Sequence, residues 1–282
     1  MTPLAMAALL TLALAPPSIE LSVRSRTLGP GELAVLSITL SEPAERLLVR
    51  AFDRDVPAFR DGDRVWRALV GIDLDVRPGT YPITVAAGTA HAACDLIVKP
   101  RTFPTRRLTV NEAFVTPPAA ELTRIQDEAA LLAGVWRSPA AERLWTGAFV
   151  RPVPGAANSA FGTRSVYNGK PRTPHGGADF LSPGGTPVHA PNAGRIAVAR
   201  ALYFTGNTVV IDHGLGLFSM LAHLSVIDVH EGDLVAAGAV VGQVGATGRV
   251  TGPHLHWAVR VGDARVDPLS LLAMLGATPA TP

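Results

Sequence analysis

Two histidines lie one residue apart near the C-terminal end of the chain, in the stretch TGPHLHWAV at residues 251–259. Residues two apart in a strand point to the same face, so His254 and His256 can aim at one point. Upstream, HGGAD places His175 four residues before Asp179. The two glycines between them oppose a helix and favour a loop that enters a strand. Imidazole and carboxylate groups in such a set are typical ligands of zinc.

Two histidines and one carboxylate are a common ligand set of catalytic zinc, because three protein ligands leave one position open for water. The pKa of the bound water falls to about 7, so hydroxide is available at neutral pH. His175, Asp179 and the two histidines of the HxH pair are already more than the three ligands that such a site requires. His223 in MLAHLS adds a fifth candidate. Surplus histidines would be free to transfer protons and to stabilise an oxyanion. The residues alone leave open which histidine of the HxH pair, His254 or His256, would bind the metal.

Each motif is weak evidence alone, since HxxxD is frequent by chance and HxH can be a structural pair. Together they are stronger, because seven of the eight histidines lie in residues 175–256. The single cysteine, Cys94, excludes an intramolecular disulfide and an all-cysteine metal site within these 282 residues. A metal must therefore be held by His, Asp or Glu. The remaining histidines are predicted to be structural or exposed: His91, His189, His213 and His230.

The elements that must position these residues are mostly strands. Residues 149–270 combine many glycines with short β-branched runs, which predicts a compact, mostly antiparallel β domain. Residues 19–100 alternate apolar and polar residues between turns such as Gly29-Pro30-Gly31, which predicts a small, immunoglobulin-like β-sandwich. The fold class is therefore mostly β, and residues 271–282 are predicted to form a C-terminal tail.

Residues 101–148 are predicted to link the two domains and to contain one helix. Prolines 117 and 118 suit its start, and Ser138-Pro139 suits its end. Apolar residues recur in between at steps of three and four, which gives one apolar helix face. They are Leu122, Ile125, Ala129, Leu132 and Trp136.

The composition and the net charge limit the kinds of protein that this chain can be. Hydrophobic residues make up 48% and charged residues 17% of the chain, which allows a sizeable core. The formal net charge of +2 gives no electrostatic case for nucleic acid as a partner. Residues 1–15 contain an apolar run that suits a signal peptide, the alternatives being a buried first strand or a mis-assigned start. We therefore expect export to the periplasm or cell envelope, and no integral membrane segment after signal cleavage.

Four stretches together resemble the lysostaphin-type (LytM-like) zinc metallopeptidases in order and spacing. They are HGGADF, GTPVHAP, GNTVVIDHGLGLFSMLAHLS and EGDLVAAGAVVGQVGATGRVTGPHLHWAV, within about residues 149–270. The segment RTFPTRRLTV and the helix after it resemble the segment that precedes this domain in exported members with an N-terminal immunoglobulin-like module.

The resemblance implies a role for each residue that matches the family's motifs. His175, Asp179 and His256 would bind one Zn²⁺ per chain. His254 would face the bound water and the substrate, with His223 as its partner, and both would be catalytic.

Three further positions depend on the resemblance. Leu221 stands where the family usually has a tyrosine before His-Leu-Ser. Tyr167 and Tyr203 are the candidates for an active-site tyrosine that some members carry.

The function implied is hydrolysis of peptide bonds in peptidoglycan stem or cross-bridge peptides, with a substrate groove walled by loops at 161–172 and 201–207. One alternative is a catalytically silent domain that regulates or activates cell-wall amidases. Another is a wall-binding adhesin that acts through its β-sandwich. The N-terminal domain could also bind a protein partner in the cell envelope.

Overall fold

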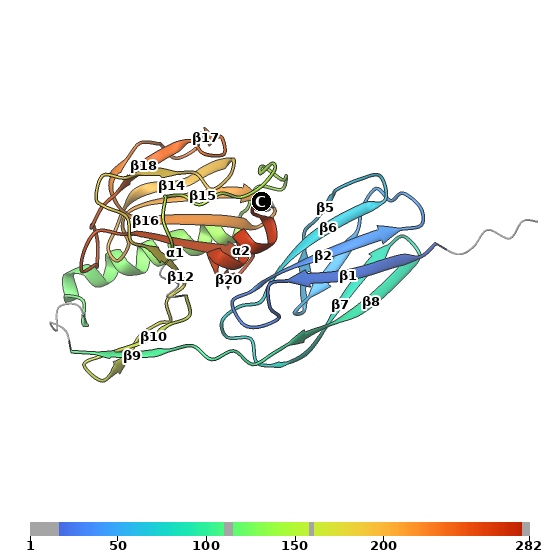
Figure 1. Ribbon diagram of the computed structural model, residues 1–282, viewed down its shortest axis with the longest axis horizontal. Coiled ribbons are helices and arrows are strands. Elements are labelled where there is room, and N and C mark those ends of the chain that lie inside the picture. The colour runs from blue at the N-terminus through green and yellow to red at the C-terminus, as the bar shows by residue number, and fades with distance from the viewer. Residues whose placement is uncertain (1–16, 110–114, 158–160, 278–282) are drawn as a thin grey trace, which may run out of the picture.

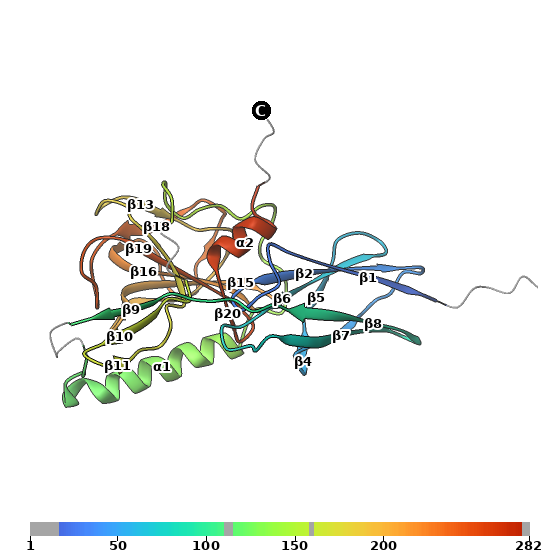
Figure 2. The same ribbon diagram turned by 60° about the horizontal axis from the view of Figure 1, so that its bottom comes forward.

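The computed structural model describes residues 17–109, 115–157 and 161–277, so the predicted signal peptide lies outside the described residues. Figures 1 and 2 show two β-rich parts side by side, with α2 near their junction. The predicted fold class, mostly β with one helix between the two parts, is confirmed. Within the described ranges, no helix is long and apolar enough to cross a membrane.

The N-terminal part is a sandwich of two four-stranded antiparallel sheets, with strand orders β1-β2-β6-β5 and β4-β3-β7-β8. The alternating stretches of residues 19–100 form strands, as predicted. Its immunoglobulin-like identity stays a prediction. The strands are β1 Ile19–Ser25, β2 Leu33–Leu40, β3 Leu48–Ala51, β4 Arg54–Val56, β5 Ala58–Arg60, β6 Val65–Gly71, β7 Gly79–Ala87 and β8 Ala90–Val98.

Strand β2 serves two cores, which explains why its sequence LAVLSITL is apolar on both faces. Leu36 and Ile38 are fully buried inside the sandwich. Leu33 and Val35, on the opposite face, pack into the core of the C-terminal part. A strand covered on both faces loses the apolar–polar alternation of a half-exposed strand. The first half of β2 is therefore part of an interface between the two β-rich parts.

The C-terminal part contains a nine-stranded sheet whose main path is β12-β19-β16-β15-β14-β17, and a small sheet β11-β10-β9. In the small sheet, β9 from the predicted linker pairs in parallel with β10. The strands are β9 Thr105–Leu108, β10 Arg164–Tyr167, β11 Lys170–Pro171, β12 Gly177–Phe180, β13 Pro187–His189, β14 Gly194–Leu202, β15 Gly206–Gly214, β16 Leu217–Ile227, β17 Leu234–Val235, β18 Val240–Val244, β19 Leu255–Val261 and β20 Ala264–Val266.

The predicted helix is α1 (Leu122–Arg137), preceded by a 3-10 turn at Ala119–Glu121. Its C-terminal half packs on the large sheet, where the ring of Trp136 meets that of Phe218 edge-on at 5.1 Å. Figure 2 shows α1 lying along one side of the sheet. At the other end Leu122 is 46% exposed, so only part of the predicted apolar face is covered.

A second helix, α2 (Pro268–Leu275), follows the sheet. The side chain of Asp267 caps it by accepting a hydrogen bond from the backbone N–H of Leu269. The helix runs beyond the boundary predicted at residue 270, and Leu271 is fully buried in the core. Its first turn also contacts the sandwich.

A buried polar cluster joins the two parts at this helix. Glu32 and Asp267, both 1% exposed, come from different parts of the chain. Arg26 donates hydrogen bonds to Glu32 at 2.6 Å and to Asp267 at 2.8 Å, and Arg101 donates to Glu32 at 2.8 Å. Ser270 donates to the other oxygen of Glu32 at 2.7 Å. Each buried carboxylate is therefore paired and hydrogen-bonded, as burial of charge requires.

A second contact lies close to the segment that leads into β12. Arg265 in β20 pairs with Asp73 of the sandwich through two nitrogens, at 2.6 and 3.0 Å. Phe161 packs so closely on Gly31 that a Cβ there would lie 2.2 Å from its ring. Gly31 also has φ +83°, which a side chain would strain. The sandwich thus abuts the loop between residues 161 and 176.

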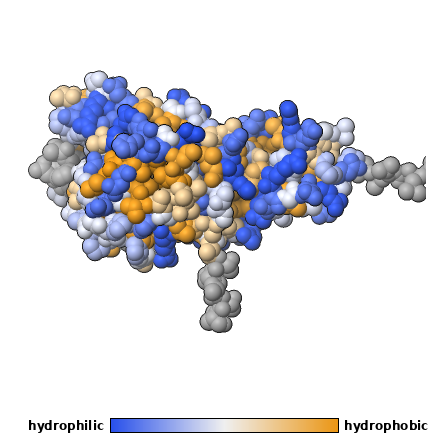
Figure 3. Space-filling model, turned by 90° about the horizontal axis from the view of Figure 1, so that it is seen from above, coloured by the Kyte–Doolittle hydropathy of each residue, from blue (hydrophilic) through white to orange (hydrophobic). Residues whose placement is uncertain are grey.

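The surface differs between the two parts on the face that Figure 3 presents. Apolar area gathers on the C-terminal part, whereas the sandwich is mainly hydrophilic there. Large apolar side chains exposed on the C-terminal part include Leu181 (72%) and Leu234 (69%).

We expect Glu32→Ala to lower the free energy of unfolding by about 3 kcal/mol, because it removes the buried carboxylate that Arg26, Arg101 and Ser270 share and leaves both arginines with Asp267 alone. Urea unfolding measures this change. The matched control is Asp55→Ala, which breaks an exposed ion pair with Arg50 and should cost less than about 1 kcal/mol. Equal losses in the two variants would contradict a structural role for the cluster.

Candidate metal centre

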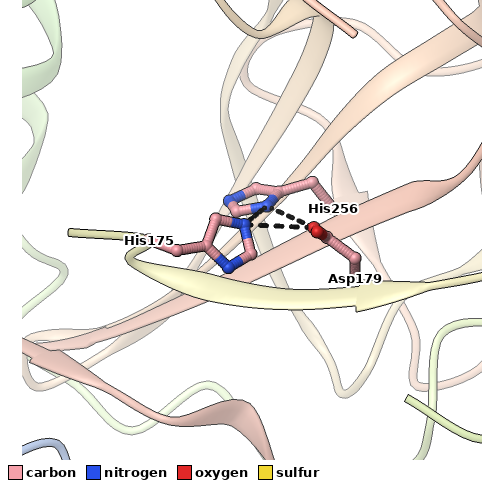
Figure 4. A group of neighbouring side chains, drawn as sticks. All are labelled: His175, Asp179 and His256. Carbon is pink, nitrogen blue, oxygen red and sulfur yellow. Dashed lines mark hydrogen bonds and ion pairs between the residues drawn. The ribbon is translucent and has the colours of Figure 1, made fainter. Parts of the chain in front are cut away.

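Two of the predicted ligands lie opposite each other on adjacent antiparallel strands. Asp179 in β12 pairs in register with His256 in β19. Directly opposed residues share one face of a sheet, so both side chains point the same way. His175 lies two residues before β12, in the loop that the sequence predicted. Figure 4 shows all three side chains pointing toward one another.

The three ligand atoms are close enough to share an ion. Nε2 of His175 lies 2.9 Å from Nδ1 of His256 and 3.1 Å from Oδ1 of Asp179. Nδ1 of His256 lies 3.0 Å from the same carboxylate oxygen. Atoms at these separations have a common point about 2 Å from each, which matches the length of zinc–nitrogen and zinc–oxygen bonds. The donor set and its spacing therefore fit a zinc ion.

Gly177 permits the close approach of β12 to β19, a role that the sequence reasoning missed. A Cβ at this position would lie 2.5 Å from the carbonyl oxygen of Trp257 and 2.8 Å from Nε2 of His256. The backbone of His175 is fixed on both sides, since its N–H donates to Thr163 and its carbonyl accepts from Gly162. A glycine beside a ligand in a strand is the sequence signal for such an approach.

The electrostatics favour a charged aspartate beside neutral imidazole. Burial opposes ionisation of Asp179, but hydrogen bonds and positive charge from His175 and His256 outweigh it and hold the pKa of the carboxyl well below its usual range. Burial lowers the pKa of His256 despite the hydrogen bond to Asp179. Metal ions require deprotonated ligands, and both residues are in that form at neutral pH.

His254 lies just before β19 and contacts the same carboxylate more loosely. Its Nε2 is 3.8 Å from Oδ1 of Asp179. Its Nδ1 is 2.9 Å from the carbonyl oxygen of Gly252, which can only accept a hydrogen bond. A neutral His254 therefore carries its proton on Nδ1 and presents a bare Nε2 toward the ligand group. Leu255, between the two histidines, is fully buried in the core.

His223 in β16 completes the histidine group. Its ring centroid lies 4.9 Å from that of His254 and 5.9 Å from that of His256. Its neighbour Ala222 pairs with His256, so regular alternation would turn His223 to the opposite face. The backbone of His223 instead adopts φ +65°, an uncommon conformation that recurs at functional sites. The sequence pattern gave no sign of this irregularity.

The environment of His223 keeps it neutral. Burial lowers its pKa to about 4, and repulsion between the protonated rings of His223 and His256 adds to this effect. Nδ1 lies 2.9 Å from the carbonyl oxygen of Thr247 and so carries the proton. His223 thus presents a bare Nε2, as His254 does.

The other predicted positions lie elsewhere. Leu221 is fully buried in the core, on the face of β16 away from the ligands. The ring of Tyr167 lies 5.8 Å from the guanidinium carbon of Arg172, and that of Tyr203 meets the ring of Phe204 edge-on. No contact recorded among residues 17–109, 115–157 and 161–277 joins either tyrosine to the histidine group.

The remaining histidines are structural or exposed, as predicted. His230 is 92% exposed. His213 is fully buried near the end of β15 rather than in a turn, with ring nitrogens 2.8 Å from the carbonyl oxygen of Ala193 and 3.0 Å from the hydroxyl of Ser219. His189, predicted at the surface, is half-buried, and its Nδ1 donates to the carbonyl of Gly238 at 2.8 Å.

Comparison with known proteins places the same region in one family. The sequence model described as Peptidase family M23 matches residues 173–268, which include all five residues of the site. The crystal structure of a putative peptidase M23 from Pseudomonas aeruginosa is 35% identical, covers 88% of this chain and 96% of its own, and has a TM-score of 0.71. The similarity to this structure therefore includes the N-terminal sandwich as well as the C-terminal part.

Two curated relatives match a shorter region. The peptidoglycan DD-endopeptidase ShyB of Vibrio cholerae is 43% identical over 94 residues, 33% of this chain and 22% of that protein. The DD-carboxypeptidase/endopeptidase Mpg of Neisseria meningitidis is 43% identical over 97 residues, 34% of this chain and 22% of that protein. This chain thus matches less than a quarter of the length of either relative.

Buried His213, which lies outside the metal centre, should make the stability of the fold depend on pH. Burial lowers the pKa of His213 to about 4, from 6.5. Between these values the unfolded chain binds a proton that the folded chain does not, so stability present above pH 6.5 is lost as the pH falls toward 4. From pH 7 to pH 5, metal-free wild type should lose about 2 kcal/mol more than His213→Gln.

Urea unfolding at the two pH values measures this difference. His230→Gln is the control, because an exposed histidine should leave the pH dependence of the wild type unchanged. Parallel pH dependence in wild type and His213→Gln would show that His213 is not buried in its neutral form.

Proposed function

The chain belongs to peptidase family M23, and from this membership we propose that it is a zinc metalloendopeptidase that hydrolyses peptide bonds in peptidoglycan stem or cross-bridge peptides. One observation carries the proposal. Three ligand atoms from His175, Asp179 and His256 meet within about 3 Å of one another, and two further imidazoles stand beside them. The names of the relatives ShyB and Mpg support a peptidoglycan substrate.

In this proposal His175, Asp179 and His256 hold one Zn²⁺ per chain. When bound there, zinc polarises the peptide carbonyl and lowers the pKa of water to about 7. A ligand set of two imidazoles and one carboxylate suits zinc, whereas Mg²⁺ and Ca²⁺ are typically bound by oxygen ligands alone. The pairing of β12 with β19 keeps two of the ligands fixed relative to each other.

His254 and His223 are the proposed catalytic residues outside the metal ligands. Each donates from Nδ1 to a backbone carbonyl, so each neutral ring offers Nε2 as a proton acceptor. Either can take a proton from the attacking water and then, as an imidazolium, donate to the oxyanion or to the leaving amine. His254 lies nearer the ligands, through its 3.8 Å contact with Asp179, which favours it as the general base.

A site in the periplasm or cell envelope follows from this substrate, because peptidoglycan lies outside the cytoplasmic membrane. The N-terminal sandwich remains a candidate for contact with another envelope protein. The catalytically silent alternative is less well supported, since both the metal-ligand set and the two additional histidines are complete.

Digestion of purified sacculi tests the proposal. Zinc-loaded protein should release peptide fragments, and mass spectrometry should identify new amine and carboxylate ends at one type of peptide bond. A protein that binds zinc yet releases no fragments would favour the regulator. A protein that binds sacculi through residues 19–100 alone, without hydrolysis, would favour the adhesin.

Two substitutions separate the proposed roles of the paired histidines. His256→Ala should abolish both zinc binding and hydrolysis, because it removes a ligand. His254→Ala should retain zinc at one ion per chain while turnover falls at least about 100-fold, the size of a lost general base. Zinc content by mass spectrometry and turnover of cross-linked muropeptides measure both effects. Loss of zinc from His254→Ala would mean that His254 is itself a ligand.

A further inference from the structure

The turn that joins β14 to β15, at residues 203–205, connects helix α1 to the histidine group. At one end of the turn, the backbone N–H of Tyr203 donates to Oε2 of Glu128 in α1 at 2.7 Å. At the other end, the backbone carbonyl of Thr205 accepts a hydrogen bond from the N–H of His223 at 2.9 Å. A turn of three residues therefore lies between a carboxylate of the helix and the backbone of a proposed catalytic residue.

The same hairpin also supports the ring of His223, through the loop that follows β18. The backbone carbonyl of Phe204 accepts from the N–H of Arg249 in this loop at 2.9 Å. The backbone N–H of Asn207 donates to the hydroxyl of Thr247 at 2.9 Å. The carbonyl of Thr247 in turn accepts from Nδ1 of the His223 ring at 2.9 Å. Both the backbone and the ring of His223 are thus held by groups that contact the β14–β15 hairpin.

The backbone of His223 needs this support. Its φ of +65° is uncommon for a residue with a side chain, and such conformations persist only where the surrounding contacts determine them. The register of β15 with β16 shifts between Asn207 and Val209, so that His223 is paired with no residue of β15. Regular strand pairing therefore does not fix the direction of the imidazole. The hydrogen bond to Thr205 takes the place of the missing strand contact.

Glu128 is held firmly enough to fix the turn. Its side chain is only 17% exposed, and its second carboxylate oxygen accepts from Nε of Arg124, one helical turn earlier, at 2.8 Å. The guanidinium carbon of Arg124 also lies 5.9 Å from the centre of the Tyr203 ring. The helix is fixed on the sheet by the packing of Trp136 on Phe218. Because the acceptor is charged, the bond from Tyr203 belongs to the stronger class of hydrogen bonds.

We propose that Glu128 is a positioning residue for the reaction, and that α1 fixes His223 beside the metal ligands through the turn at residues 203–205. This inference rests on the proposed function, in which His223 transfers a proton. Groups that act on a reacting substrate must be held to within about 0.5 Å of their productive position. The helix between the two β-rich parts therefore contributes to turnover and is more than a spacer.

Two substitutions at Glu128 test the role of its acceptor oxygen. Glu128→Ala removes the acceptor of the Tyr203 N–H, while alanine favours the helix itself. For cross-linked muropeptides and zinc-loaded protein, kcat should fall at least about tenfold, because a misplacement of about 1 Å can cost about 100-fold. KM should stay within about twofold, since the lost contact acts on the transition state. Glu128→Gln keeps an oxygen that can accept from Tyr203, and should restore kcat to within about threefold of the wild type.

Amide hydrogen exchange, followed by NMR in the zinc-loaded protein, measures the same link without turnover. In the wild type the N–H of His223 is protected by its bond to Thr205, and in Glu128→Ala it should exchange at least about tenfold faster. The amide of Leu221, which is fully buried two residues earlier in β16, is the internal reference and should exchange at its wild-type rate.

Glu121→Ala is the matched control, because it removes a 3.6 Å ion pair with Arg124 on the same helix and leaves the contact with Tyr203 in place. Both its kcat and its His223 exchange should equal those of the wild type. A kcat as low in this control as in Glu128→Ala would overturn the inference, because any disturbance of the helix would then suffice.

Three other results decide the matter. Unchanged exchange of His223 in Glu128→Ala, or an unchanged kcat, would overturn the inference and leave the proposed function intact. Faster exchange at Leu221 as well would mean general loss of the fold, and would also overturn a positioning role. A wild type that hydrolyses no muropeptide would overturn the proposed function together with the catalytic part of the inference, whatever the exchange of His223.

Discussion

The site depends on the close pairing of β12 with β19. This pairing sets Asp179 opposite His256 on one face of the sheet, and it requires a residue without a side chain at Gly177. The three proposed ligand atoms lie within hydrogen-bonding distance of one another as a result. A group fixed by strand register has little conformational freedom to lose when an ion binds, which favours tight coordination.

The N-terminal sandwich is joined to this sheet by a packed and charged interface. Strand β2 contributes side chains to both cores, and buried carboxylates from each part share two arginines. The sandwich also meets the loop before β12 through Phe161 on Gly31. Interfaces of this kind restrict relative domain motion, so the sandwich provides a fixed support for the loop that carries His175.

Much of this arrangement could be predicted from the sequence, because strands, turns and the helix follow local patterns. The shared direction of His254 and His256 followed from the period of a strand, and the loop before Asp179 followed from two glycines. The left-handed backbone of His223 could not be predicted, since it arises from an irregularity in the pairing of β16. The separate roles of His254 and His256 came from family resemblance, and the loose 3.8 Å contact of His254 supports them.

The central claim is that zinc is bound by two imidazoles and one carboxylate, with His254 and His223 outside the ligand set. X-ray absorption at the zinc edge of the zinc-loaded protein tests it most directly. The account predicts four light-atom ligands at about 2.0–2.2 Å, of which two are imidazoles. Three or more imidazoles, which would make His254 or His223 a ligand, would contradict it.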